Sequence, residues 1–370
     1  MLLMQLDMPL RARIHIISSL TRGKTYRFYD SKNIEQMKFA YRQFFVPDLT
    51  KPKNSEKQIM VKLMKLYFAP LEGITTYTYR NIHKEFFGGC DEYFAPFITP
   101  SANEKVSIKS LRDIMPENNR NLQPAVQVMA NQPEAFLNFE EKIKELGYTS
   151  VNLNFGCPSS TVVKKNRGAG ALLDIEKLDN FLKGVFEKSS LQISVKTRIG
   201  FFGADEMQGI MAVYNKYPIS RLIVHPRTRQ DYYSGIPDMA AFEEALCCAK
   251  MPVCYNGNIF SVKDFEGIRE RFGGLDSVMI GRGAISNPAI FREIKGGEKL
   301  KTRELVDFTK ALKEKYLDLL GSEIYTLHKL KEIWIYNMWN YPDEKKLLKA
   351  IKKSNRLADL ICAIECLPEL

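Results

Sequence analysis

Eight short apolar runs recur along the chain from residue 65 onward, roughly thirty residues apart, with helical patterns between them. Runs rich in β-branched and aromatic residues are typical of strands, and their alternation with helices predicts parallel pairing. The predicted strands are residues 66–70, 92–98, 124–130, 150–156, 192–198, 221–227, 252–258 and 277–283. The predicted helices include residues 133–147, 177–188, 240–250 and 262–273.

This pattern predicts an α/β fold and favours a (β/α)8 barrel, the TIM barrel, over residues 64–300. Such a barrel accommodates eight parallel strands without an exposed sheet edge. The alternative is a doubly wound open sheet, which has fewer strands and a glycine-rich fingerprint after the first one. Here the first strand runs into LEGITTYTYR, and neither a G-x-G-x-x-G nor a P-loop motif occurs in the chain.

After Gly297 the pattern is wholly helical. Two series of apolar residues recur at helical intervals. They are Leu305, Phe308, Leu312, Tyr316 and Leu319, followed by Leu327, Leu330, Ile333, Trp334 and Met338. We therefore predict a small all-helical domain over residues 301–370, packed on the barrel.

The excess of positive charge is concentrated in residues 1–63. The chain carries a formal net charge of +11, and +7 of it lies in this segment. The segment has little hydrophobic periodicity, and its residues 47–57 have the composition of a linker. Three interpretations of this basic extension stay open: a disordered arm, a loosely helical appendage, or translation from a start upstream of the true one. The charge favours an acidic partner such as nucleic acid.

Composition restricts the class of protein. The 370 residues are 45% hydrophobic and 26% charged, which is typical of a globular protein with a sizeable core. No run of 18 apolar residues occurs, so we expect no membrane span. The seven cysteines are odd in number and form no C-x-x-C pair, which favours reduced thiols. We expect a cytoplasmic protein, and a monomer.

Polar residues cluster at the carboxyl ends of the last six predicted strands. In a TIM barrel these ends meet on one face, where the active site lies. The residues are Gln127, Asn152, Asn154, Cys157, Lys196, Arg198, His225, Arg227, Asn256, Gly257, Asn258, Gly281, Arg282 and Gly283. A single such residue is usually a hydrogen-bonded core group, but six consecutive strand ends favour a site for chemistry.

Two groups among these residues fit a phosphate-bearing cofactor. Gly281 and Gly283 flank Arg282, so backbone N–H groups and a guanidinium can approach an anion there. A glycine turn needed only for the path of the chain is the alternative. Lys196 can stabilise negative charge on a cofactor ring, and Gln127 can hydrogen-bond to a ring edge.

Cys157 follows the fourth strand and precedes Pro158, so it begins a loop. A free thiol with a pKa of roughly 8.5 is mostly protonated near neutrality and can donate a proton. Most lone cysteines only pack, but this position beside Asn154 favours a catalytic role. The cysteines at positions 362 and 366 lack further ligands nearby in sequence, so we expect no metal site.

Seven segments in order resemble the tRNA-dihydrouridine synthases, over residues 64–340. They are APLEGITTYTYR, QVMANQP, NLNFGCPSSTVVKKNRGAGALL, VKTRIG, VHPRTRQDYYSG, YNGNIF and IGRGAISNPAIF. The cysteine motif together with H-P-R-T-R-x-x-x-Y-x-G is highly specific to this family. The chain departs from the family at Leu71, where methionine is common, and at Asn258, where an acidic residue is common. Residues 1–63 have no counterpart.

The resemblance implies an enzyme that uses FMN and NADPH to reduce uridine in tRNA to 5,6-dihydrouridine. Cys157 would be the general acid, and Asn154 and Arg198 would position the target base. The residues that would hold FMN are Pro70, Leu71, Gln127, Lys196, His225, Asn256, Gly257, Gly281 and Arg282.

The helical domain would grip the RNA. Residues 329–356 hold eight Lys and Arg against three acidic residues, and Lys329 and Lys331 are candidates for binding the substrate. A solvated helix face is the alternative. Two other functions stay open: an FMN barrel acting on a free pyrimidine or dihydroorotate, and a non-catalytic RNA-binding protein. The motifs do not indicate which uridine is modified.

Overall fold

The computed structural model describes residues 64–101 and 108–370, so the predicted extension 1–63 lies outside the described residues. Within these residues eight strands form where the sequence predicts them. They are β1 (Lys65–Phe68), β2 (Glu92–Tyr93), β3 (Gln127–Val128), β4 (Ser150–Phe155), β5 (Gln192–Gly200), β6 (Leu222–Thr228), β7 (Val253–Tyr255) and β8 (Ser277–Ile280).

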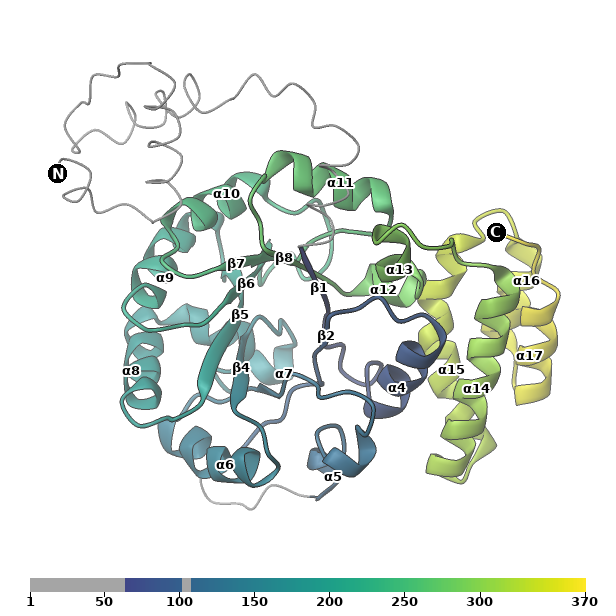
Figure 1. The fold of residues 1–370 in the computed structure, drawn as a ribbon, viewed down its shortest axis with the longest axis horizontal. Coiled ribbons are helices and arrows are strands. Elements are labelled where there is room, and N and C mark those ends of the chain that lie inside the picture. The colour runs from purple at the N-terminus through teal and green to yellow at the C-terminus, as the bar shows by residue number, and fades with distance from the viewer. Residues whose placement is uncertain (1–63, 102–107) are drawn as a thin grey trace. The chain divides into compact units, whose positions relative to one another are not determined.

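The strands close into a barrel. Every strand pair is parallel, and the order is β2-β1-β8-β7-β6-β5-β4-β3. The two ends of this order are joined by parallel bridges from Phe94 to Ala125 and from Ile98 to Val128, next to β2 and β3. The predicted TIM barrel is therefore confirmed, and the doubly wound alternative is wrong (Figure 1).

Helices alternate with the strands and surround the barrel (Figure 1). They are α4 (Tyr77–Phe86), α5 (Ile108–Leu111), α6 (Pro133–Glu145), α7 (Ser160–Val163), α8 (Ile175–Phe186), α9 (Met207–Tyr214), α10 (Met239–Cys248), α11 (Val262–Arg271), α12 (Arg282–Ser286) and α13 (Ile290–Ile294). Short 3-10 turns are η2 (Pro116–Asn118), η3 (Gly168–Leu173) and η4 (Ala204–Glu206). The four predicted helices correspond to α6, α8, α10 and α11.

Side chains along each strand alternate between the barrel interior and the surrounding helices, because successive Cβ atoms point to opposite faces. Leu66 and Phe68 of β1 join the large core between strands and helices. The interior holds a separate cluster of Tyr67, Ala69, Phe94, Ile223, Cys254 and Met279. Two positions beyond three of these residues come His225, Asn256 and Gly281, so the inner cluster forms a floor beneath the polar strand ends.

Residues 301–370 form the predicted helical region. Its elements are α14 (Thr302–Leu320), α15 (Glu323–Asn337), η5 (Met338–Asn340), α16 (Lys345–Lys353) and α17 (Leu357–Glu365). α14 packs on α4 and α15 packs on α12. The buried Asn337 Nδ2 donates to the carbonyls of Ile285 and Ser286 at 2.7 and 3.2 Å. Because α12 follows β8 directly, these bonds hold the helical region beside the carboxyl ends of the strands.

The described residues belong to one compact unit. The domain boundary at residue 300 stays a prediction. Among the described residues, no helix combines the length and apolar character that crossing a bilayer requires.

Candidate active site

Strand register brings the predicted polar residues together at the barrel mouth. Asn154 pairs with Lys196 between β4 and β5, and Arg198 pairs with His225 between β5 and β6. Four cationic side chains, those of Lys196, Arg198, Arg227 and Arg282, follow in order around this end. Within the described residues none of the four forms an ion pair with a carboxylate, so the mouth carries unbalanced positive charge.

Cys157 lies just after β4, in a loop that the neighbouring chain holds closely. Gly168 has a φ of +55°, and a Cβ added there would lie 2.7 Å from the Cys157 carbonyl oxygen. The Ala169 N–H donates to this same carbonyl at 3.0 Å. Gly168 therefore allows residues 168–169 to pack directly against the cysteine loop and to form a hydrogen bond with it.

The Cys157 thiol remains protonated at neutral pH. Burial raises its pKa above the ordinary value of 9.0, and the nearby Glu72 carboxylate raises it further. A hydrogen bond with the Ser159 backbone, together with the cations of Arg198 and Lys196, opposes this shift. The group is therefore a thiol with a proton to donate, rather than a resting thiolate.

A chain of amide side chains fixes the start of the cysteine loop. The Asn154 Oδ1 accepts from the backbone N–H groups of Gly156 and Cys157 at 2.9 and 3.0 Å. Its Nδ2 donates to Gln127 Oε1 at 2.8 Å, and Gln127 Nε2 donates to Asn152 Oδ1 at 2.7 Å. Asn154 therefore positions Cys157, while both polar atoms of the fully buried Gln127 side chain are hydrogen-bonded to the neighbouring strand β4.

Lys196 is a half-buried cation without a partner. Among the described residues its ammonium group makes no hydrogen bond or ion pair. A Cβ placed on Gly156 would lie 3.9 Å from Lys196 Nζ, so the ammonium lies beside the cysteine loop. Burial, and then the neighbouring Arg198, lower its pKa from 10.5 to about 8. An anion bound in the mouth would offset both the loss of hydration and the repulsion from Arg198.

His225 is neutral, and its tautomer follows from one contact. Arg227 Nη1 lies 2.9 Å from His225 Nε2, and a guanidinium can only donate, so Nε2 accepts and the ring proton is on Nδ1. Burial and the surrounding cations lower the pKa of His225 well below its ordinary value. The imidazole therefore offers an uncharged N–H donor at the mouth.

Arg198 links the ends of three strands. Its Nε donates to the Gly156 carbonyl at 2.8 Å, and its Nη1 donates to the Thr228 carbonyl at 2.7 Å. The guanidinium lies over the ring of Tyr233 at 5.4 Å, and burial lowers its pKa to about 10. Within the described residues Nη2 makes no hydrogen bond, so this nitrogen is available to a ligand.

The glycines after β7 and β8 have different surroundings. A Cβ on Gly283 would lie 1.9 Å from the Ile259 carbonyl, and one on Gly257 would lie 1.9 Å from Tyr255 Oη, so both glycines are required for packing. At Gly281 an added Cβ would meet only side-chain carbons, at 3.4 Å or more.

Polar side chains accompany these glycines. Arg282 Nη2 donates to Asn258 Oδ1 at 3.1 Å, and Asn256 Nδ2 donates to the Met279 carbonyl at 2.8 Å. Asn258 also accepts from Arg227 Nη2 at 3.2 Å. One amide oxygen therefore accepts hydrogen bonds from two guanidinium groups.

Most of the backbone groups in the turn after β1 form hydrogen bonds within the turn itself. The Leu71 N–H donates to Thr75 Oγ1 at 2.8 Å, and the Leu71 carbonyl accepts from the N–H groups of Ile74 and Thr75. Among the described residues the Pro70 carbonyl makes no hydrogen bond. Of the two predicted backbone contacts, the one from Pro70 is thus the more accessible.

The two lysines predicted to bind substrate are engaged within the protein. Lys329 Nζ contacts the Gly73 carbonyl and Glu332 Oε2, each at 2.9 Å, and Lys331 Nζ donates to the Ser354 carbonyl at 3.0 Å. The lysines of α16 differ from them, since they are exposed and make no ion pair within the described residues. These are Lys345, Lys346, Lys349, Lys352 and Lys353.

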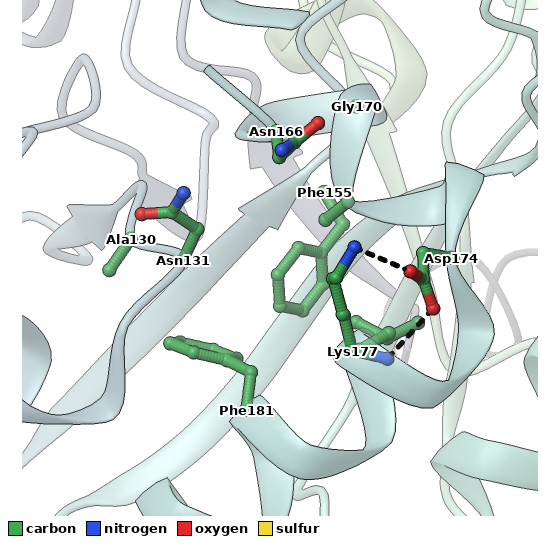
Figure 2. Close-up of a pocket in the computed structure, with 10 residues that line it drawn as sticks. Ala130, Asn131, Phe155, Asn166, Gly170, Asp174, Lys177 and Phe181 are labelled. Carbon is green, nitrogen blue, oxygen red and sulfur yellow. Dashed lines mark hydrogen bonds and ion pairs between the residues drawn. The ribbon is translucent and has the colours of Figure 1, made fainter.

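A small cavity of about 120 Å³ lies beside β4 and α8 (Figure 2), and none of the four cationic residues of the mouth lines it. Phe155 and Phe181 line it, and Lys177 forms an ion pair with Asp174 at 2.8 Å on its wall. Pockets for cofactor-sized ligands commonly measure about 300–1,000 Å³. This cavity includes none of the predicted cofactor residues, and we assign it no role.

Comparison with known proteins decides the family. A model described as dihydrouridine synthase matches residues 67–355. The chain belongs to the dihydrouridine synthase family. A tRNA-dihydrouridine(16) synthase of Escherichia coli O157:H7 is 28% identical over 319 residues, which cover 82% of this chain and 98% of that protein. A "Probable tRNA-dihydrouridine synthase" of Staphylococcus aureus (strain COL) is 26% identical over 246 residues, 65% of this chain and 73% of that protein.

Among solved structures, morphinone reductase has a TM-score of 0.45 at 11% identity and covers 64% of this chain and 86% of its own, a likeness too low to carry an argument. Family membership shows that this dihydrouridine synthase is an oxidoreductase that forms dihydrouridine in tRNA. The predicted activity is confirmed, and neither the free-pyrimidine enzyme nor the non-catalytic RNA-binding protein describes it.

Sequence reasoning missed the aromatic residues of the mouth. Tyr233 stacks on His225, with ring centroids 6.2 Å apart, and lies beneath Arg198 and Arg282. Tyr233 lies in the H-P-R-T-R-x-x-x-Y-x-G motif, but the motif alone predicts no function for this side chain. Phe260 ends the YNGNIF segment, whereas Trp339 belongs to no quoted segment, and the fold brings the two rings together, at 5.5 Å between centroids.

Proposed function

We propose that this dihydrouridine synthase works with FMN as its bound cofactor, NADPH as reductant and Cys157 as the general acid. One observation carries the proposal: a protonated thiol lies beside the cations of Lys196 and Arg198, neither of which has a carboxylate partner among the described residues. A reaction that builds negative charge on a bound uracil needs positive charge and a proton donor at one place.

The donor set at the mouth fits an anionic flavin nucleotide. Lys196 lacks a partner within residues 64–101 and 108–370, His225 presents a neutral Nδ1–H, and Arg282 lies beside the uncrowded Gly281. These groups, with Asn256, would hold the phosphate, the ribityl chain and the ring. FMN, when bound, supplies the hydride that reduces the 5,6 double bond of uracil.

The chain's own groups supply the proton and the orientation. Cys157 Sγ–H donates its proton to C5 of the uracil, and Asn154 keeps the cysteine loop in position through two backbone N–H groups. Arg198 Nη2 is the donor available to a uracil carbonyl. Because the thiol pKa is raised, the proton is present throughout the neutral range.

The target uridine must leave its stack to reach this site, which costs a few kcal/mol. Phosphate contacts from the exposed lysines of α16 would offset part of this cost. We place the reaction in the cytoplasm, where the seven free cysteines would stay reduced, and we propose that the enzyme acts as a monomer.

The test begins with tRNA from a strain that lacks this gene. Purified enzyme is loaded with FMN and incubated with NADPH and this tRNA, and dihydrouridine is mapped by mass spectrometry. We expect one tRNA position to become reduced, to be compared with position 16 in the name of the Escherichia coli relative. Omission of NADPH should abolish multiple turnover. A protein that cannot be loaded with FMN would disprove the proposal.

A further inference from the structure

A line of aromatic and cationic side chains leads from the catalytic loop to the helical region. Arg198 contacts the Gly156 carbonyl and lies 5.4 Å from the centre of the Tyr233 ring. Arg282 lies over Tyr233 at 5.2 Å and over Phe260 at 5.8 Å, so it joins the two rings.

The line continues across the boundary between barrel and helices. Phe260, in the loop after β7, meets Trp339 of η5 edge to face, with centroids 5.5 Å apart. Trp339 in turn meets Tyr336 of α15 at 5.5 Å. We call Tyr233, Phe260, Tyr336 and Trp339 the aromatic surface.

The aromatic surface stays partly open to solvent. Trp339 is 47% exposed and Tyr233 is 52% exposed. Large exposed apolar side chains that adjoin one another mark a binding surface more often than isolated ones do. The other tryptophan of the chain, Trp334, is fully buried and packs inside the helical region.

The surroundings of the surface select its occupant. Arg282 bridges two of its rings without an ion pair among the described residues, so a partner should combine flat apolar faces with negative charge. Unpaired nucleotides of a nucleic acid have both properties, because each has a base with a π-face and a backbone phosphate. RNA loops are commonly recognised through bases that stack on aromatic side chains.

We propose that Trp339 stacks on an unpaired base of the substrate tRNA, near the uridine that enters the barrel. The aromatic surface would thereby replace the stacking that this part of the tRNA loses when the uridine leaves its stack. The inference rests on tRNA being the substrate. It concerns how the RNA is bound, so it can be disproved without disproving the assignments of FMN, NADPH and Cys157.

The first experiment uses the intrinsic fluorescence of the FMN-loaded enzyme. Of the two tryptophans only Trp339 is exposed, so stacking should quench its emission when tRNA binds. The variant Trp339→Phe keeps Trp334 and corrects for absorption by the RNA. Heparin, a polyanion without bases, should not quench. Equal tRNA quenching of wild type and Trp339→Phe, or equal quenching by heparin, would overturn the proposal.

The second experiment measures binding and turnover in Trp339→Ala. We expect the Kd for tRNA and the KM to rise about ten-fold, with kcat at saturating tRNA and flavin content unchanged. Trp339→Phe should recover most of the affinity. The slope of log Kd against log salt should stay as in wild type, because stacking releases no counterions.

A matched control is Ile324→Ala at the other end of α15, which removes an exposed apolar side chain that is not aromatic. It should bind tRNA as wild type does. If Trp339→Ala also binds and turns over tRNA as wild type does, the proposal is wrong. If wild type itself forms no dihydrouridine in tRNA, the function is wrong instead, and the two failures are thus distinguished.

Discussion

Lys196 combines a cost in stability with a use in the reaction. Its ammonium group is half-buried and unpartnered within the described residues, and its pKa falls from 10.5 to about 8. A folded-state pKa below the unfolded value means that the unfolded chain binds the proton more readily. Lys196 therefore destabilises the fold fully below pH 8, and this cost disappears as pH rises toward 10.5.

We predict that Lys196→Met stabilises the flavin-free protein while weakening its binding of FMN. The free energy of unfolding at pH 7 should rise by about 1–3 kcal/mol, after allowance for partial exposure of the side chain. The gain should shrink as pH rises above 8. Chemical denaturation across pH measures the stability, and flavin titration measures the binding.

The matched control for this substitution is Lys188→Met, which removes an exposed lysine. Its effect should stay within about 0.5 kcal/mol at every pH. Destabilisation by Lys196→Met that does not depend on pH would show that the ammonium group is well solvated in the folded protein, contrary to our account.

At the scale of elements, α16 presents the charge that the substrate needs. Ile351 faces the core and is fully buried, whereas the five lysines of the helix are exposed. Lys329 and Lys331, the lysines predicted to bind substrate, contact the turn after β1 and the end of α16, and their contact with RNA stays a prediction. We propose that the exposed lysines of α16 also contact phosphate.

We predict that the double variant Lys349→Gln, Lys353→Gln binds tRNA more weakly at low salt. These residues lie one turn apart on one face of α16, so one stretch of backbone can contact both. Each lost phosphate contact should reduce the slope of log K against log salt by about 1. Filter binding across salt concentrations measures this slope.

The control for α16 is Lys183→Gln on α8, where the lysine pairs with Glu187 at 4.0 Å on the outside of the barrel. Its salt slope should match that of wild type. An unchanged slope in the double variant would place the RNA backbone elsewhere. A loss confined to affinity, with the slope retained, would indicate that α16 acts by packing.

Across the whole molecule, the strand positions and the barrel were predictable because apolar runs and helical stretches alternate along the sequence. The gathering of Cys157, Lys196 and His225 was predictable for the same reason, since parallel strands end on one face. Their detailed partners were not predictable. Lys329 bonds to Gly73, 256 residues away, and no local pattern records such a pairing.

The aromatic surface as a whole was likewise not predictable, because Tyr233 and Phe260 lie in separate motifs and Tyr336 and Trp339 lie in none. Phe260 and Trp339 come from the barrel and from the helical region, and they meet only because Asn337 holds α15 on α12. The approach of the Gly283 backbone to an anion stays a prediction, and the structure adds a packing reason for this glycine, since a Cβ there would lie 1.9 Å from the Ile259 carbonyl oxygen. Contacts of this kind depend on packing between residues that are distant in the sequence.

The variant Cys157→Ala tests most directly whether Cys157 supplies the proton in this dihydrouridine synthase. The measurement is single-turnover formation of dihydrouridine in tRNA from a strain lacking the gene, with NADPH-dependent flavin reduction followed in parallel. We predict that flavin content and flavin reduction stay as in wild type, while dihydrouridine formation slows about 10²–10⁴-fold. Dihydrouridine formation at the wild-type rate would contradict the account.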